Sequence, residues 1–311
     1  MDKYNNKNQE SCGEYPISNN QDCREYGEYP INESGLYLNK KKHFNQDILP
    51  SCLNVSTISL TFQLNTIVNL KNINEYMTIS ENDICSIDFE GNLRTVLPKK
   101  KIKKRKSNNF YNSITLEIMV RKTQTVDDKI IPSKVINFKI FKNGGVQIAG
   151  CKNINEGNIA IQKLISRLST NIGIESEGKM QEITFTEKPI TVTDIKINLI
   201  NVNFKLDFNI NRELLYQVLL NDNIICYYEK CKHAGVCVKF NPPEKEKPIS
   251  IFIFESGSIV ITGSKNEQHI LTGYKHVTKI IKNKKKQITK IPSELLMSNT
   301  MMKKYGKHME L

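Results

Sequence analysis

The sequence predicts an α+β fold that contains the same β-α-β-β-β-β-α unit twice. The clearest observation is a repeated frame, I-F-x-x-G-x5-G-x-K, which begins at Ile140 ("IFKNGGVQIAGCK") and again at Ile253 ("IFESGSIVITGSK"). Ile253 stands 113 positions after Ile140, and every matched position keeps this spacing. The second observation is that similar apolar patterns precede and follow both copies. Self-similarity over so long a period indicates a duplicated structural unit.

Each unit is expected to open with a strand followed by a short helix. Apolar residues alternate, as in a half-buried strand, at Ile58, Leu60, Phe62 and Leu64 in the first unit and at Val202, Phe204, Leu206 and Phe208 in the second. The short helices are expected to carry Ile67 and Leu70 in the first unit, and Leu214, Leu215, Val218 and Leu219 in the second. Further strands are predicted at 113–120 ("SITLEIMV") and at 235–240 ("GVCVKF").

The repeated frame itself predicts a β-hairpin followed by a helix. Alternating residues flank a turn that contains Gly144 in the first copy and Gly257 in the second. Helical stripes then recur at Ile161, Leu164, Ile165 and Leu168 and at Ile270, Tyr274, Val277 and Ile281. Asn153 and Asn266 are the expected N-caps of these helices.

The two units are predicted to occupy residues 51–170 and 190–286, joined by a linker at 171–189. Residues 1–50 are rich in Asn, Glu, Tyr and Lys and poor in aliphatic side chains. Such a composition cannot bury enough apolar surface to offset the entropy of ordering the chain. We therefore expect a disordered N-terminal tail, and a C-terminal tail at 287–311.

The chain is strongly basic, with a formal net charge of +13 and a pI near 9.2. This balance favours acidic partners, nucleic acid first, although a genome rich in A·T pairs also enriches a sequence in Lys, Ile and Asn. The charge is densest in an insertion at 98–109, "PKKKIKKRKSNN", which repels itself and suits an exposed loop. The insertion could act as a phosphate-binding arm or a nuclear-import signal, or it could be a solvated loop only.

Several classes of function are disfavoured by the residues present. Lys152 does not follow directly after Gly150, as a P-loop requires for its amides and ammonium group to share one phosphate. One Cys/His cluster fits no common zinc spacing: Cys226, Cys231, His233 and Cys237. No local Ser/His/Asp or Cys/His set supports catalysis, so we expect a protein that is not an enzyme and uses no metal or cofactor. Eight cysteines without CxxC pairs suit a reducing compartment, and neither a signal peptide nor a membrane span is expected.

The hairpin of the second unit predicts a sheet that is apolar on both faces. Within "SIFIF", Ile251 and Ile253 point to one side, whereas Phe252 and Phe254 point to the other. Helices that cover one face leave the second exposed, and an exposed aromatic face is typical of a binding surface. The alternatives are that Phe252 lies beneath a loop or tail, or that Phe141 and Phe254 point into the core.

The order of elements, the duplicated frame and the basic charge resemble the TATA-box-binding protein family. The resemblance covers about residues 52–168 and 190–286. It implies a curved, saddle-shaped antiparallel sheet with four helices on its convex face. It also implies that the concave face lies in the minor groove of DNA, where two pairs of phenylalanines wedge into base steps and kink the duplex.

The resemblance implies a set of DNA-binding residues. Phe141 and Phe254 match one wedge position in each unit. The second wedge positions are occupied by Tyr111, or by Phe110 with a one-residue slip, and by His233. Family positions that read bases or touch the backbone are matched by Lys239, Val260, Thr262, Lys152 and Lys265.

The first unit departs from the family pattern at several of these places. Gln147 and Ala149 replace the groove-facing valine and threonine, and Glu117 stands where the family prefers a cation. The paired asparagines of the family's opening strands map poorly, with Asn54 and Ile195 as the nearest matches. The fold follows from the resemblance, but strict TATA readout does not.

We therefore expect a divergent family member that binds and bends AT-rich, promoter-like double-stranded DNA to help start transcription. Its expected partners are initiation factors and the RNA polymerase machinery, within the cell, in the nucleus or at another site of transcription. Only Glu229 keeps the acidic character of the family's docking stretch for the next initiation factor, which indicates a dedicated partner. Two alternatives stay open: a saddle-fold scaffold that contacts mainly transcription proteins, and a sequence-indifferent nucleic-acid binder that uses the basic insertion.

Overall fold

The computed structural model describes residues 37–39, 43–98, 112–126, 129–131, 133–176, 179–243 and 247–290. Its central element is one antiparallel sheet of eleven strands, in the order β12-β13-β14-β15-β11-β1-β8-β7-β4-β2-β3. Two further strand pairs, β5 with β6 and β9 with β10, form separate hairpins. The expectations for residues 1–36, for 99–111 within and after the basic insertion, and for 291–311 lie outside the described residues.

The elements follow the predicted order in both repeats. The first repeat comprises β1 (Asn54–Gln63), α1 (Leu70–Tyr76), β2 (Ile84–Phe89), β3 (Asn92–Thr95), β4 (Ser113–Arg121), β5 (Gln124–Val126), β6 (Lys129–Ile131), β7 (Lys134–Phe141), β8 (Gly145–Cys151) and α2 (Ile154–Leu168). The hairpin of β9 (Ile172–Ser176) and β10 (Lys179–Ile183) lies within the predicted linker. The second repeat comprises β11 (Thr193–Lys205), α3 (Arg212–Asn221), β12 (Cys226–Tyr227), β13 (Gly235–Phe240), β14 (Ile249–Phe254), β15 (Ser258–Ser264) and α4 (Glu267–Ile288). The predicted α+β saddle-type fold is thus confirmed, and the first repeat adds β3 and the β5–β6 hairpin.

One residue expected in a helix lies outside it. Ile67 precedes α1 and is 43% exposed, because the chain around Val68 is still extended and bridges to Thr186. The helix begins only after Asn69, whose side chain accepts a hydrogen bond from the Asn72 amide and so caps the first turn.

The two repeats are related by a pseudo-twofold axis through the middle of the sheet. β1 pairs with β8 in the same register as β11 pairs with β15, which makes Leu60 equivalent to Val202 and Ile58 equivalent to Ile200. Ile58 and Ile200 are also direct partners across β1 and β11. The axis therefore passes between these two isoleucines.

The symmetry extends to irregularities in the central strands. The β1–β11 register shifts at Ser56 and at Asn198, which are equivalent residues on either side of the axis, and a third shift lies between Thr61 and Gln63. An extra residue of this kind bends a strand and increases its twist. Both central strands are therefore bent at matching distances from the axis.

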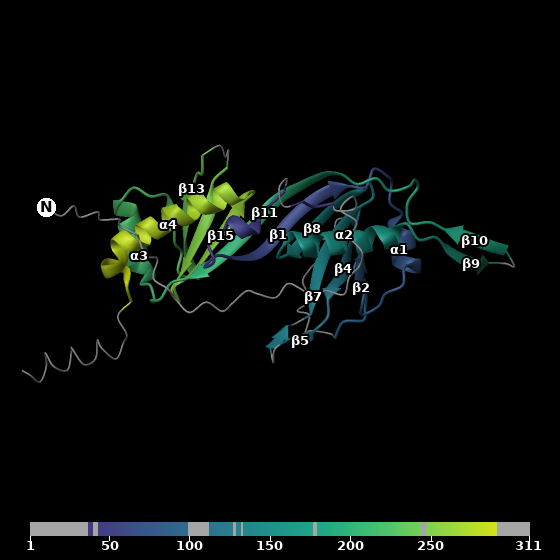
Figure 1. Cartoon of the computed structure of the whole chain (residues 1–311), viewed down its shortest axis with the longest axis horizontal. Coiled ribbons are helices and arrows are strands. Elements are labelled where there is room, and N and C mark those ends of the chain that lie inside the picture. The colour runs from purple at the N-terminus through teal and green to yellow at the C-terminus, as the bar shows by residue number, and fades with distance from the viewer. Residues whose placement is uncertain are drawn as a thin grey trace, which may run out of the picture. The chain divides into compact units, whose positions relative to one another are not determined.

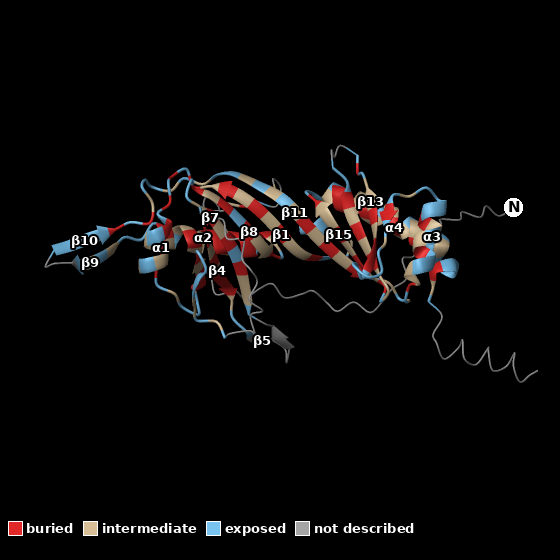
Figure 2. Cartoon of the chain, turned by 180° about the vertical axis from the view of Figure 1, so that it is seen from behind, coloured by how far each residue is buried: buried red, intermediate tan, exposed pale blue. Residues whose placement is uncertain are grey.

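Among the residues that the structure describes, helices cover one face of the sheet and leave the other open. α2 packs on β4 and β8, and α4 packs on β14 and β15 (Figure 1). Toward the helices, every second residue of β14 is completely buried, namely Ile249, Ile251 and Ile253. Seen from behind, strands such as β11, β1 and β8 are banded, with buried residues in alternation with half-buried or exposed ones over much of their length (Figure 2). We call the uncovered side the open face.

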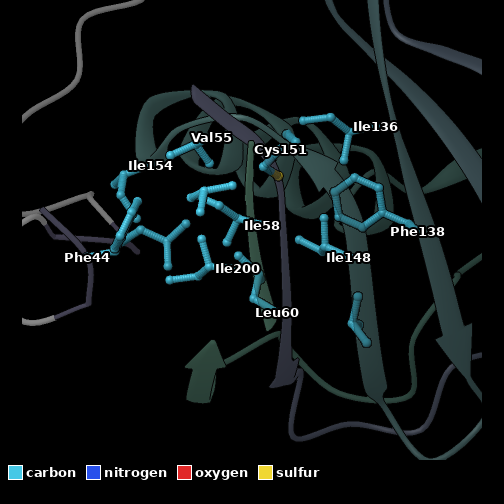
Figure 3. Packing of buried hydrophobic residues seen from close by; sticks show 14 of the residues in the cluster. Phe44, Val55, Ile58, Leu60, Ile136, Phe138, Ile148, Cys151, Ile154 and Ile200 are labelled. Atoms are coloured by element: carbon cyan, nitrogen blue, oxygen red, sulfur yellow. The ribbon is translucent and has the colours of Figure 1, made fainter. Parts of the chain in front are cut away.

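A single apolar cluster beneath the helices joins both repeats. Ile58, Leu60 and Phe138 from the first repeat and Ile200 from the second all belong to it (Figure 3). All four are at most 1% exposed. Because the cluster crosses the axis, the repeats share one core rather than two.

The N-terminal segment joins this core earlier than expected. Residues up to 50 were expected to be disordered, but Leu38 and Phe44 are each 1% exposed. The Asn158 side chain on α2 accepts a hydrogen bond from the Leu38 amide (2.7 Å) and donates one to its carbonyl (3.0 Å). Phe44 belongs to the same apolar cluster as Ile154 at the start of α2 (Figure 3). Two apolar side chains and two buried hydrogen bonds thus offset the entropy of ordering this short stretch.

The long helices begin where the sequence indicates. Asn153 caps α2 by accepting from the Glu156 amide, and Asn266 caps α4 by accepting from the His269 amide. No helix among the described residues is long and apolar enough to cross a membrane.

Candidate nucleic-acid interface

The open face is crossed by rows of side chains, one from each neighbouring strand. Strand pairing defines one row in the second repeat that runs through Asn203, Val260, Phe252, Cys237 and Tyr227. The first four are half-buried and Tyr227 is 58% exposed. This row is largely apolar or aromatic beyond Asn203, the residue nearest the axis.

The equivalent row in the first repeat is polar. It runs through Thr61, Gln147, Lys139, Thr115 and Asp88. Each residue occupies the same place in the pairing pattern as its counterpart in the second repeat, with Gln147 in the place of Val260. The two halves of the open face therefore share a backbone arrangement but differ in chemistry.

Phe141 and Phe254 end strands β7 and β14 at equivalent positions, and both point away from the core. The preceding residues, Ile140 and Ile253, are completely buried, whereas the two phenylalanines are half-buried. The alternative that they point into the core is thereby excluded. Phe254 lies against Gly235, where an added Cβ would stand 3.1 Å from two carbons of the phenyl ring.

The turn after each phenylalanine depends on glycine. Gly144 and Gly257 have φ angles of 81° and 79°, a region that side chains disfavour. A Cβ at Gly144 would also collide with the carbonyl oxygen of Thr66, and one at Gly257 with that of Phe208. Each turn therefore packs closely on the segment that follows β1 or β11, and this packing positions the phenylalanine before the turn.

Only one of the two predicted second wedge residues can be placed. Ser113 pairs with Phe141, and Gly235 pairs with Phe254. Ser113 and Gly235 are therefore equivalent positions in the two repeats. His233, two residues before Gly235, is exposed in the preceding loop. Tyr111 holds the corresponding position in the first repeat, and it lies outside the described residues, as does Phe110.

Arg212 fixes the loop that carries His233, a role that the sequence did not predict. Its guanidinium donates to the Ala234 carbonyl (2.7 Å) and to the Glu255 carboxylate (2.8 Å). Lys290 also donates to Glu255; this bond, together with Arg212, holds the pKa of the Glu255 carboxyl below its usual range. No local pattern indicates this network, because its four residues come from four separate segments.

The equivalent place in the first repeat is a hollow. A space of about 610 Å³ is lined by Ile67, Asn112, Phe141, Lys142 and Asn143. Asn112 and Lys142 correspond there to Ala234 and Glu255, the two residues that Arg212 joins in the second repeat. The surroundings of the two phenylalanines therefore differ.

Lys239 lies on the open face, where its ammonium group donates to the Ser250 hydroxyl at 2.6 Å. Thr262 is the partner of Ser250 on the next strand and shares this face, whereas its counterpart Ala149 pairs with Asn137. The predicted positions Lys239, Val260 and Thr262 thus lie together on the second half of the face.

Lys152 and Lys265 are exposed at the strand–helix junctions, each directly before a cap asparagine. The Lys152 amide donates to the Glu156 carboxylate (2.8 Å), and the Lys265 amide donates to the His269 ring (3.4 Å). Neither ammonium group forms an ion pair with any residue that the structure describes.

Glu229, the predicted partner-binding residue, is exposed in the loop before β13. Its carboxylate forms a 2.6 Å ion pair with Lys232, so the local charge is neutralised within the loop. Phe252, which the sequence places on the expected aromatic face, lies on the open face, and so does Lys139, which was not predicted although the alternation in β7 places it there.

The fold and the face define a two-repeat protein of the saddle type, and comparisons with known proteins agree. Residues 194–284 match the family model described as Transcription factor TFIID (or TATA-binding protein, TBP). The chain is 32% identical over 290 residues to a "TATA-box-binding protein-like" protein of Acanthamoeba polyphaga mimivirus. The aligned region covers 86% of this chain and 74% of that protein. The chain belongs to the TATA-box-binding protein family of transcription factors.

Other matches are shorter or more distant. The chain is 30% identical over 128 residues to the TATA-box-binding protein of Thermococcus sibiricus, covering 41% of this chain and 57% of that protein. Among solved structures, Methanococcus jannaschii TBP superposes with a TM-score of 0.45 and 18% identity, covering 74% of this chain and 98% of that chain.

Proposed function

We propose that this chain binds duplex DNA through its open face, lies in the minor groove and bends the duplex, as a non-enzymatic factor in transcription initiation. The observation that carries the proposal is the placement of Phe141 and Phe254 at symmetric ends of this face, directed away from the core. Apolar wedges at two separate base steps kink DNA, and the bent duplex then contacts more protein surface. A planar phenyl ring enters a base step without leaving a polar group unpaired.

The centre of the open face suits the floor of the minor groove. Beside the axis, β1 and β11 present half-buried polar residues: Thr57, Ser59, Thr61, Asn201 and Asn203. Hydroxyl and amide groups can donate hydrogen bonds to adenine N3 and thymine O2, the acceptors that every A·T pair shows there. Lys239, Lys152 and Lys265 supply cations for the phosphates at the edges.

The DNA partner proposed is AT-rich and promoter-like, and the protein partners are initiation factors and the polymerase machinery. Glu229 marks the loop for such a factor, and its pairing with Lys232 favours a dedicated partner over one that requires an acidic surface. Action at the nucleus or another site of transcription is part of the same proposal.

Gel-shift and bending assays on matched AT-rich and GC-rich duplexes test the proposal. Tight binding with a large bend on the AT-rich duplex supports it. Equal binding of both duplexes without a bend would instead identify a sequence-indifferent binder. No binding of either, with retained binding to transcription proteins, would identify a scaffold.

A further inference from the structure

Gln147 and Val260 hold equivalent positions on the open face and offer DNA opposite chemistry. Gln147 lies between Thr61 and Lys139 across the strands, and Val260 lies between Asn203 and Phe252. The Gln147 side chain is exposed, and its amide has no hydrogen-bond partner among the described residues. It projects from the β7–β8 strand pair of the first repeat, as Val260 projects from the equivalent β14–β15 strand pair of the second.

The minor groove distinguishes base pairs chiefly by one donor. A·T pairs show only the acceptors adenine N3 and thymine O2, whereas a G·C pair adds the guanine N2 amino group. A glutamine amide can donate to the acceptors through its NH2 group and accept from guanine through its carbonyl oxygen. A valine can do neither, so a guanine amino group beneath it loses its water without gaining a partner.

We propose that Gln147 makes this protein read an asymmetric target, in which the half-site under the first repeat contains a G·C pair and the half-site under the second repeat does not. Gln147 accepts a hydrogen bond from guanine N2 in the first half, and Val260 excludes guanine from the second. This inference rests on the proposed minor-groove function. A face with the same residue at this position in both repeats would not distinguish the two half-sites.

Site selection from a random duplex library tests the assignment with the wild type, Gln147→Val and Val260→Gln. We expect the wild type to select sites with guanine in one half only. Gln147→Val should select A·T pairs in both halves, and Val260→Gln should accept guanine in both. Both positions are on the open face, so thermal melting of the variants should match the wild type.

Inosine substitution isolates the hydrogen bond, because inosine lacks the N2 amino group while pairing with cytosine. Replacing the selected guanine with inosine should weaken wild-type binding about three- to tenfold, the usual worth of one net hydrogen bond. The same replacement should leave Gln147→Val unchanged or tighter. An undiminished wild-type affinity, or a guanine preference that survives in Gln147→Val, would overturn the inference while leaving DNA binding intact. Absence of binding to every duplex would overturn the proposed function itself.

Discussion

Glu117 and Lys239 occupy the same position in the two repeats and carry opposite charges. Glu117 pairs with Asn137 across β4 and β7, and Lys239 pairs with Ser250 across β13 and β14. Asn137 and Ser250 are themselves equivalent, 113 residues apart in the repeated frame. The open face therefore carries a cation toward one end and a carboxylate toward the other, although the backbone is symmetric.

We expect Glu117→Lys to tighten DNA binding. A carboxylate near the phosphates repels them, whereas an ammonium group neutralises one and releases its counterion. The slope of log affinity against log salt should steepen by roughly 0.9 for each phosphate gained. Affinity measured by fluorescence anisotropy over a salt series gives both quantities.

Lys239→Glu is the matched control, because it makes the reverse change at the equivalent position. It should weaken binding and flatten the salt slope by a similar amount. If Lys239→Glu has this effect but Glu117→Lys changes neither quantity, the outer strand of the first repeat does not approach the DNA.

Deletion of residues 99–106, the lysine block of the insertion, should lower affinity for all duplexes by a similar factor. Cations that contact phosphates add affinity without reading bases, so the deletion should flatten the salt slope while sequence preference is kept. Gel shifts of the deletion variant at several salt concentrations measure this. An unchanged slope would assign the block to a solvated loop.

His276 should make the fold sensitive to acid. Its ring on α4 stacks on Phe240 with centroids 4.1 Å apart, and burial, aided by Lys279, lowers the pKa of the imidazole. Because the folded-state pKa lies below the unfolded value of about 6.5, the neutral ring stabilises the fold. This contribution is fully present above about pH 6.5 and is lost as the pH falls through the folded-state pKa.

Thermal melting from about pH 7.5 down to about pH 5 tests this dependence. His276→Phe keeps an aromatic stack on Phe240 and cannot be protonated, so its melting temperature should fall less over the same range. Parallel curves for the two proteins would show that other groups cause the acid sensitivity.

His233→Phe should increase the DNA bend at neutral pH. The imidazole nitrogens need hydrogen-bond partners that a base step does not supply, whereas a phenyl ring needs none. His233 is exposed, and Arg212 holds its loop by a hydrogen bond to the Ala234 carbonyl. The substitution should therefore leave the fold unchanged. An unchanged bend in His233→Phe would place His233 outside the DNA contact, and a smaller bend would contradict the expected gain from a phenyl ring.

The fold was largely predictable because its signals are local and occur twice. The repeated frame fixes both hairpins, and Asn153 and Asn266 start the helices at the predicted residues. The docking of Leu38 and Phe44 was not predictable, because it depends on Asn158 and on apolar contacts more than 100 residues away. Composition alone describes a segment's average, and two apolar side chains hardly change that average.

The candidate site was predictable only in part for the same reason. Alternation in the strands shows that Phe254 and Val260 share a face, and the repeat shows that Gln147 is the counterpart of Val260. The full rows require the strand register, which connects Tyr227 to Cys237 and Asp88 to Thr115 across separate segments. The tie from Arg212 to the His233 loop likewise exists only in the folded chain.

The DNA bend angle of wedge variants tests the central claim most directly. It can be measured by energy transfer between dyes at the ends of a short AT-rich duplex, with Phe141→Ala and Phe254→Ala compared with the neighbouring core variants Ile140→Ala and Ile253→Ala. We expect each phenylalanine variant to melt near the wild-type temperature, to bend DNA less and to lose roughly 1–3 kcal/mol of binding, as for a lost base–aromatic stack. Each isoleucine variant should instead lose about 2–5 kcal/mol of stability. Phenylalanine variants that bend DNA like the wild type, or that unfold like the isoleucine variants, would contradict the account.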